Sequence, residues 1–176
     1  MSEALAKRLQ PCGPVRDAEA AARLHERLAE AADADGWRAT LDAAWAALEP
    51  VFAASPYLAG LARRWPERLR LTLDAEPEAR LAEILADADA LTGAPDEAKA
   101  PLRHLKAELH LLTALCDLGG VWDLDQVTGA LSRFADAAAR AALGAVGGGS
   151  PRRSSRTRSA RAGAGRNIRC AASGHC

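Results

Sequence analysis

The sequence has few aromatic residues and no long hydrophobic run. Phenylalanine, tryptophan and tyrosine make up 4% of the 176 residues, and the β-branched residues that favour strands are also scarce. A core must therefore rest on leucine and alanine, which are strong helix formers. No stretch approaches the roughly 20 apolar residues of a membrane span. The polar start MSEALAKRLQ lacks the apolar centre of a signal peptide. These absences predict an all-α protein.

The four cysteines show no metal-binding or redox pattern. None of Cys12, Cys116, Cys170 and Cys176 belongs to a C-x-x-C pair. The cluster of Cys170, His175 and Cys176 matches no zinc spacing and lacks a fourth ligand, so we expect no metal site. Cys116 lies beside a leucine stripe, where a cysteine is typically a small core residue. With no signal peptide, this cysteine usage favours a reduced, cytoplasmic setting.

Acidic residues are absent from the end of the chain. Residues 151–176 contain seven arginines and neither Asp nor Glu, so residues 1–150 carry a balancing net charge of −7. After Leu143 the sequence is rich in Gly, Ser and Arg and has no apolar period. Such a segment cannot bury enough surface to offset its chain entropy. We therefore expect residues 144–176 to form a disordered basic tail.

Leucine spacing and helix-end residues predict the helices between residues 17 and 143. Two amphipathic segments, 17–35 and 38–48, are followed by Gly36 and Pro50, which predict helix ends. Ser55-Pro56 predicts the next start, because serine caps free N–H groups and proline fits the first turn. The whole pattern predicts an irregular bundle of about five or six helices over residues 17–143.

The strongest predicted helix runs from Asp96 or Leu102 to Leu118. Gly119-Gly120 predicts its end, and Asp123 with Gln126 three residues later resembles a capping box for the last helix. Beside the leucines, this helix carries a polar stripe: Arg103, Lys106, His110, Thr113 and Asp117. The stripe predicts a possible domain-docking face. It is equally consistent with a solvated face, or with charged ends that pair with neighbours inside the fold.

The first sixteen residues have no place in this bundle. Pro11, Gly13 and Pro14 interrupt any helix there. The sequence thus predicts a loosely attached N-terminus over residues 1–16, before the helical domain.

Two segments resemble the bacterial glutamine synthetase adenylyltransferase/adenylyl-removing enzymes. One is LRHLKAELHLLTALCDLGGVWDLDQVTGALSRFADAA, from Leu102 to Ala138. The other, SPYLAGLARRWPERL at Ser55 to Leu69, is similar to the family's "SP-aromatic-L … PE-L" segment. The likeness covers about residues 50–142, so the chain is expected to be an N-terminal helical segment of such an enzyme.

The resemblance implies a full enzyme that transfers AMP from ATP to a tyrosine of glutamine synthetase. It also implies removal of that AMP by phosphorolysis, under control of a PII signalling protein and glutamine. In the family, a Gly-Ser turn and Asp-x-Asp motif hold the nucleotide phosphates and magnesium ions. This chain lacks that combination, because Asp123-Leu124-Asp125 sits at a predicted helix start and follows no strand. We therefore expect no catalytic, cofactor-binding or metal residues here, and no activity from the chain alone.

The tail departs from the family, which would place a helix and then a strand there. A reading-frame shift near Leu143 would explain this, because a G+C-rich gene read out of frame tends to encode Arg, Gly, Ser and Ala. The alternative function is a free-standing helical interaction module with a basic nucleic-acid-binding tail. No aromatic residue interleaves the arginines for base stacking, so we do not expect nucleic acid as a partner.

Overall fold

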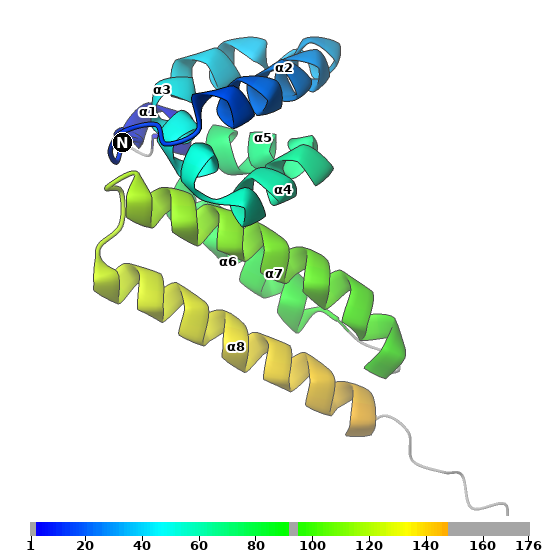
Figure 1. Ribbon diagram of the computed structural model, residues 1–176. Coiled ribbons are helices and arrows are strands. Elements are labelled where there is room, and N and C mark those ends of the chain that lie inside the picture. The colour runs from blue at the N-terminus through cyan, green and yellow to red at the C-terminus, as the bar shows by residue number, and fades with distance from the viewer. Residues whose placement is uncertain (1–2, 92–94, 148–176) are drawn as a thin grey trace, which may run out of the picture.

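The computed structural model describes residues 3–91 and 95–147, and in these ranges the chain forms helices joined by short connections, with no strand (Figure 1). This confirms the predicted all-α class. Eight helices occur in these ranges, more than the five or six expected, because prolines divide the middle of the chain into short helices. They are α1 (Leu5–Arg8), α2 (Ala18–Asp35), α3 (Arg38–Ala54), α4 (Pro56–Arg64), α5 (Pro66–Asp74), α6 (Pro77–Asp89), α7 (Pro95–Leu118) and α8 (Leu124–Gly147).

The helices form two groups that meet along α7. Helices α2 and α3 pack together as a pair, with α4 and α5 beneath them, whereas α6, α7 and α8 form a second, elongated group (Figure 1). Helix α7 contacts α6 and α8 and also reaches α3, α4 and α5. It is therefore the element that joins the two groups into one fold.

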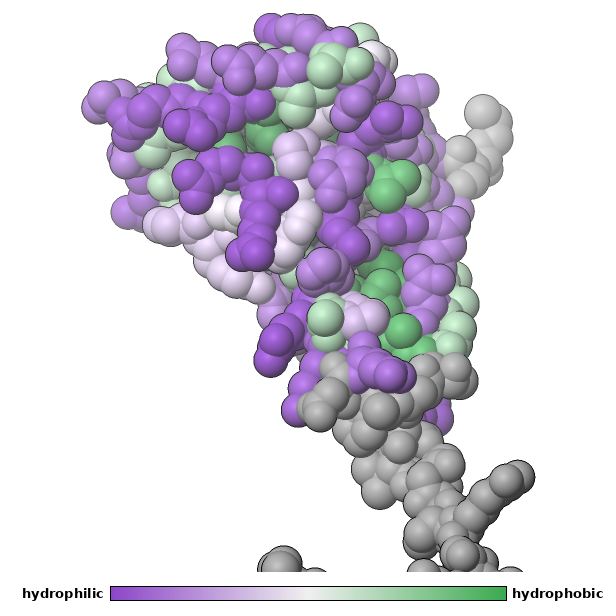
Figure 2. Space-filling view, turned by 90° about the vertical axis from the view of Figure 1, so that its right-hand side faces the viewer, coloured by the Kyte–Doolittle hydropathy of each residue, from purple (hydrophilic) through white to green (hydrophobic). Residues whose placement is uncertain are grey.

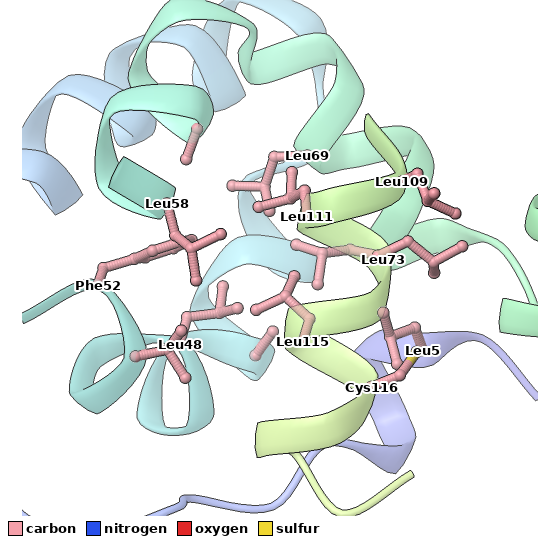
Figure 3. Packing of buried hydrophobic residues seen from close by; sticks show 14 of the residues in the cluster. Leu5, Leu48, Phe52, Leu58, Leu69, Leu73, Leu109, Leu111, Leu115 and Cys116 are labelled. Atoms are coloured by element: carbon pink, nitrogen blue, oxygen red, sulfur yellow. The ribbon is translucent and has the colours of Figure 1, made fainter. Parts of the chain in front are cut away.

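Leucine dominates the core, as the composition predicts. The side chains of Leu111 and Leu115 on α7 point toward those of Leu69 and Leu48 on α5 and α3 (Figure 3). Cys116 is fully buried in the same cluster, which confirms its prediction as a core residue. The largest apolar side chains that are almost fully buried are Leu5, Leu28, Leu41, Leu48, Leu69, Leu73, Ile84, Leu109, Leu111, Leu112 and Leu115.

The helix ends follow the predicted capping chemistry. Gly36 ends α2 in the left-handed region at φ 73°, and Gly120 follows α7 at φ 68°. Only a residue without a Cβ adopts this conformation at little cost. At the start of α8, the Gln126 N–H donates to Asp123 Oδ1 at 2.8 Å, and the Asp123 N–H donates to Gln126 Oε1 at 2.9 Å. This reciprocal pair confirms the capping box.

Pro50 does not end α3, so that prediction is wrong. The helix continues to Ala54 with Pro50 inside it, although an internal proline costs about 3 kcal/mol. Val51 and Phe52 follow it and are each 3% exposed. Burying two such side chains contributes about 1.5–3 kcal/mol each, which offsets the cost. Helix α7 likewise contains Pro101 and begins at Pro95, before either predicted start.

The N-terminus is attached more firmly than the sequence suggested. Leu5 is fully buried in the core, and its N–H donates to the carbonyl of Ala75 at 2.8 Å. The Gln10 N–H donates to the Gly119 carbonyl at 3.0 Å. The short helix α1 therefore packs against the core before the chain reaches Pro11, Gly13 and Pro14. Local sequence does not reveal this tertiary contact.

Helix α8 extends to Gly147, beyond the predicted domain end at residue 143. The rest of the predicted tail lies outside the described residues. Among the helices that the structure describes, none is long and apolar enough to cross a membrane.

Candidate functional site

Three residues of the polar stripe on α7 line a groove between helices. His110, Thr113 and Asp117 face Tyr57 of α4 and Leu131 of α8 across a space of about 400 Å³. Ser55, Leu58, Ala114 and Val127 complete the lining. The other two residues of the stripe, Arg103 and Lys106, are exposed on α7 outside the groove. The structure thus divides the predicted docking face into a groove and a solvated end.

A tyrosine–histidine pair forms the polar wall of this groove. The hydroxyl of Tyr57 lies 2.8 Å from Nδ1 of His110 and shares a hydrogen bond with it. Their rings meet edge to face with centroids 5.9 Å apart. Partial burial, with a smaller contribution from Lys106, lowers the pKa of His110 below its usual value. The lowered pKa favours the neutral form of the ring, and the pair brings two amphipathic side chains together at the groove.

The remaining surface of the groove is largely apolar. Tyr57 is 55% exposed and Leu131 is 40% exposed. Thr113 is buried and its hydroxyl donates to the Leu109 carbonyl at 2.7 Å, so it is satisfied within its own helix. Asp117 is exposed at the margin. An open apolar groove with a few polar groups suits contact with another protein surface.

The Asp-x-Asp sequence at the start of α8 serves the helix. Asp123 caps it as described above, and Asp125 lies in the first turn, where a carboxylate interacts favourably with the helix dipole. Within residues 3–91 and 95–147, no group of three or more potential metal-ligating side chains occurs. The structure therefore gives these carboxylates a local role at a helix start.

One polar cluster was not predicted from the sequence. Glu108 of α7 is buried and accepts hydrogen bonds from Arg68 of α5 at 2.5 Å and from Nε of Arg80 of α6 at 2.7 Å. Arg80 also pairs with Glu83, and its carboxylate partners raise its pKa despite the opposing effect of burial. The sequence feature that could have indicated this cluster is the acidic residue Glu108 on the leucine-bearing face of α7. Its two partners lie 28 and 40 residues away, too far for helix spacing to connect them.

Several predictions fall on residues outside the described ranges. These are the absence of a metal site at Cys170, His175 and Cys176 and the disordered basic tail after Gly147; the proposed frame shift near Leu143 is a statement about the gene that the structure does not test. They stay predictions.

The fold and groove define a helical domain with an open, largely apolar groove, and comparison with known proteins identifies its family. The family model for glutamate-ammonia ligase adenylyltransferase matches residues 45–175. This chain therefore belongs to the glutamate-ammonia ligase adenylyltransferase family, which confirms the resemblance noted in the sequence. The match also includes residues 144–175, the segment that a frame shift would place outside the family.

Several similar curated proteins are bifunctional glutamine synthetase adenylyltransferase/adenylyl-removing enzymes. The protein from Caulobacter vibrioides is 61% identical over 142 residues, which cover 79% of this chain and 14% of that enzyme. The Rhodopseudomonas palustris (strain TIE-1) enzyme is 49% identical over 100 residues, 55% of this chain and 10% of its own. The Bradyrhizobium diazoefficiens enzyme is 49% identical over 92 residues, 51% and 9% respectively.

The chain thus matches about one seventh of the length of the Caulobacter enzyme. No solved structure gives a significant match.

Proposed function

We propose that this chain is the N-terminal helical segment of a bifunctional glutamine synthetase adenylyltransferase/adenylyl-removing enzyme, and that it packs against the catalytic part. The observation that carries this proposal is the 61% identity over 79% of the chain to an enzyme of which it covers 14%. The matched length is most of the chain. An equivalent position and role in the complete enzyme follow from it.

The groove beside α7 is the surface we assign to that packing. Tyr57 and Leu131 place apolar area at its rim, and His110 contributes a polar group whose lowered pKa favours the neutral ring. A complementary apolar surface would bury this area, and the Tyr57–His110 pair would orient the contact. The role of the stripe of Arg103, Lys106, His110, Thr113 and Asp117 as a docking face is part of this proposal.

By itself, the segment performs no adenylyl transfer. Magnesium and ATP would bind in the catalytic part of the complete enzyme. In our proposal, this chain supplies none of the carboxylates that hold magnesium. Glutamine synthetase would be the substrate protein and a PII signalling protein the regulator. The setting would be cytoplasmic. These assignments follow from the family, and the experiments below separate them from a free-standing helical module.

A segment exchange tests the proposal. In the Caulobacter enzyme, the segment that matches this chain would be replaced by residues 3–142 of this chain. We expect the chimera to retain both activities on glutamine synthetase within about threefold, because the matched core is closely similar. An enzyme with the segment deleted is the negative control, and it should lose adenylyl removal.

Activity of the isolated chain supplies the complementary measurement. The chain would be incubated with glutamine synthetase, ATP and magnesium, and AMP incorporation measured by mass spectrometry. We expect none. Adenylylation by the isolated chain, or a chimera as inactive as the deletion, would contradict the proposed role.

A further inference from the structure

A second groove, between α2 and α4, is ringed by arginines. It encloses about 350 Å³ and lies apart from the groove beside α7. Arg23 and Arg27 come from successive turns of α2, and Arg63 comes from the last turn of α4. A space of this size is typical of a small-molecule site. The function proposed above gives this groove no role.

Two of these three arginines have no ion-pair partner among the described residues. Arg23 forms an ion pair with Glu19 at 2.6 Å, and both side chains are mostly exposed. Among residues 3–91 and 95–147, neither Arg27 nor Arg63 forms an ion pair or a side-chain hydrogen bond. Like charges one helical turn apart destabilise a helix slightly. Stability alone therefore does not account for gathering three guanidinium groups around one hollow.

The acidic residue at the groove is already engaged. Asp17 lines the groove, and its Oδ1 accepts a hydrogen bond from the Ala20 N–H at 2.9 Å as the cap of α2. The first turns of α2 and α4 both border the groove, since Ala20 and Pro56 line it. Helix N-termini carry partial positive charge. The electrostatic environment thus favours an anion.

The floor of the groove is apolar and built from small residues. Leu24 and Phe52 form its base, and Ala53, Ala59 and Gly60 leave the space above it open. A Cβ added at Gly60 would meet no atom within 4 Å. On the face seen in Figure 2, hydrophobic residues appear as separate patches among hydrophilic ones. The lining residues thus place an apolar floor beside a rim of arginines.

We propose that this groove binds a small anion that carries an apolar or aromatic body, with an aryl phosphate as the simplest representative. Guanidinium groups bind phosphate oxygens in bidentate geometry, so Arg27 and Arg63 hold the anionic group and Arg23 adds to the field. The ring of the ligand lies over Phe52 and Gly60. The proposal is independent of the function proposed above.

Calorimetric titration of the 176-residue chain at low salt tests the site with three probes: phenyl phosphate, inorganic phosphate and phenol. We expect phenyl phosphate to bind about tenfold or more tightly than either of the others, because it engages the rim and buries a ring on the floor. Its affinity should fall as salt is raised. Equal affinities for phenyl phosphate and inorganic phosphate would overturn the proposal.

Paired variants locate the binding. The double change Arg27→Gln with Arg63→Gln should weaken phenyl phosphate at least about tenfold, whereas Arg70→Gln, on α5 outside the groove, should leave it unchanged. Gly60→Leu should block the site by filling it. Gly129→Leu is its matched control, since this helical glycine of α8 also has no atom within 4 Å of an added Cβ. Unchanged binding in both the double variant and Gly60→Leu would overturn the assignment.

Discussion

Among the residues whose burial the structure describes, Glu108 is the one charged residue in the core. Its side chain is 2% exposed, and it accepts hydrogen bonds from Arg68 and Arg80 on two other helices. The carboxylate therefore ties α7 to α5 and α6. Removing one partner of a buried ion pair is costly, because the charges left behind are shielded from water and unpaired.

We expect Glu108→Ala to lower the free energy of unfolding by about 3 kcal/mol, measured by urea denaturation. Glu83→Ala is the matched control, since Glu83 pairs with the same Arg80 but its side chain is 61% exposed. Exposed pairs contribute about 0–1 kcal/mol. Equal losses in the two variants would show that the buried position of Glu108 adds nothing.

The described cysteines differ in their surroundings. Burial raises the pKa of the Cys116 thiol to about 12, with a smaller contribution from Glu78, whereas Cys12 is exposed. Only the thiolate is nucleophilic, so Cys116 is almost fully protonated at pH 8. This residue is a packing group in the folded chain.

We expect iodoacetamide at pH 8 to alkylate Cys12 rapidly and to leave Cys116 unmodified until urea unfolds the chain. Mass mapping of the two cysteine-containing peptides measures this. Labelling of both residues at similar rates in the native chain would contradict the packing of Cys116 in the core.

At the scale of elements, the N-terminal segment and the end of α7 fit closely together. A Cβ added at Gly119 would lie 2.4 Å from Cδ2 of Leu9 and 2.6 Å from the Leu115 carbonyl oxygen. The Gly119 carbonyl also accepts the Gln10 N–H. A side chain at residue 119 would therefore push the N-terminal segment away from α7.

We expect Gly119→Ala to destabilise the protein by about 1–3 kcal/mol. Gly129→Ala should do the opposite and stabilise it by about 0.5–1 kcal/mol, because Gly129 lies inside α8 with open space around it. Thermal unfolding of the two variants gives both signs. A neutral Gly119→Ala would mean that residues 3–10 are as loosely held as the sequence suggested.

The elements that local chemistry controls were predictable. Gly36, Asp123 and the leucine stripe of α7 act through neighbours within a few residues, so the sequence reveals them. Pro50 misled the prediction because the cost of an internal proline is balanced by burial of side chains against other helices, which local sequence does not show. The attachment of Leu5 and the partners of Glu108 depend on tertiary contacts in the same way.

The groove beside α7 was predictable in part. His110 and Asp117 share a face of one long helix, which periodicity shows directly. Tyr57 and Leu131 reach the groove from α4 and α8, and only the folded chain reveals that they meet these residues. The arginine-rimmed groove lies between α2 and α4, which α3 separates in the sequence. No pattern in the sequence predicted it.

At the scale of the whole molecule, α7 connects two helical groups and lines the groove that we propose as a docking surface. The chain belongs to a family whose similar members are several times its length. Leu131 is 40% exposed at the groove, whereas Leu124, on the same helix but outside the groove lining, is 73% exposed. These two leucines form a matched pair for testing whether the groove is a docking surface.

The central measurement is the rate of adenylyl removal from glutamine synthetase by the chimeric Caulobacter enzyme carrying Leu131→Asp or Leu124→Asp. We expect Leu131→Asp to lower the rate about tenfold, because a charge would be buried at the docking surface, equivalent to about 1.4 kcal/mol. Leu124→Asp should leave the rate unchanged, and both isolated chains should melt near the wild-type temperature. Equal rates for the two variants would contradict docking through the groove beside α7.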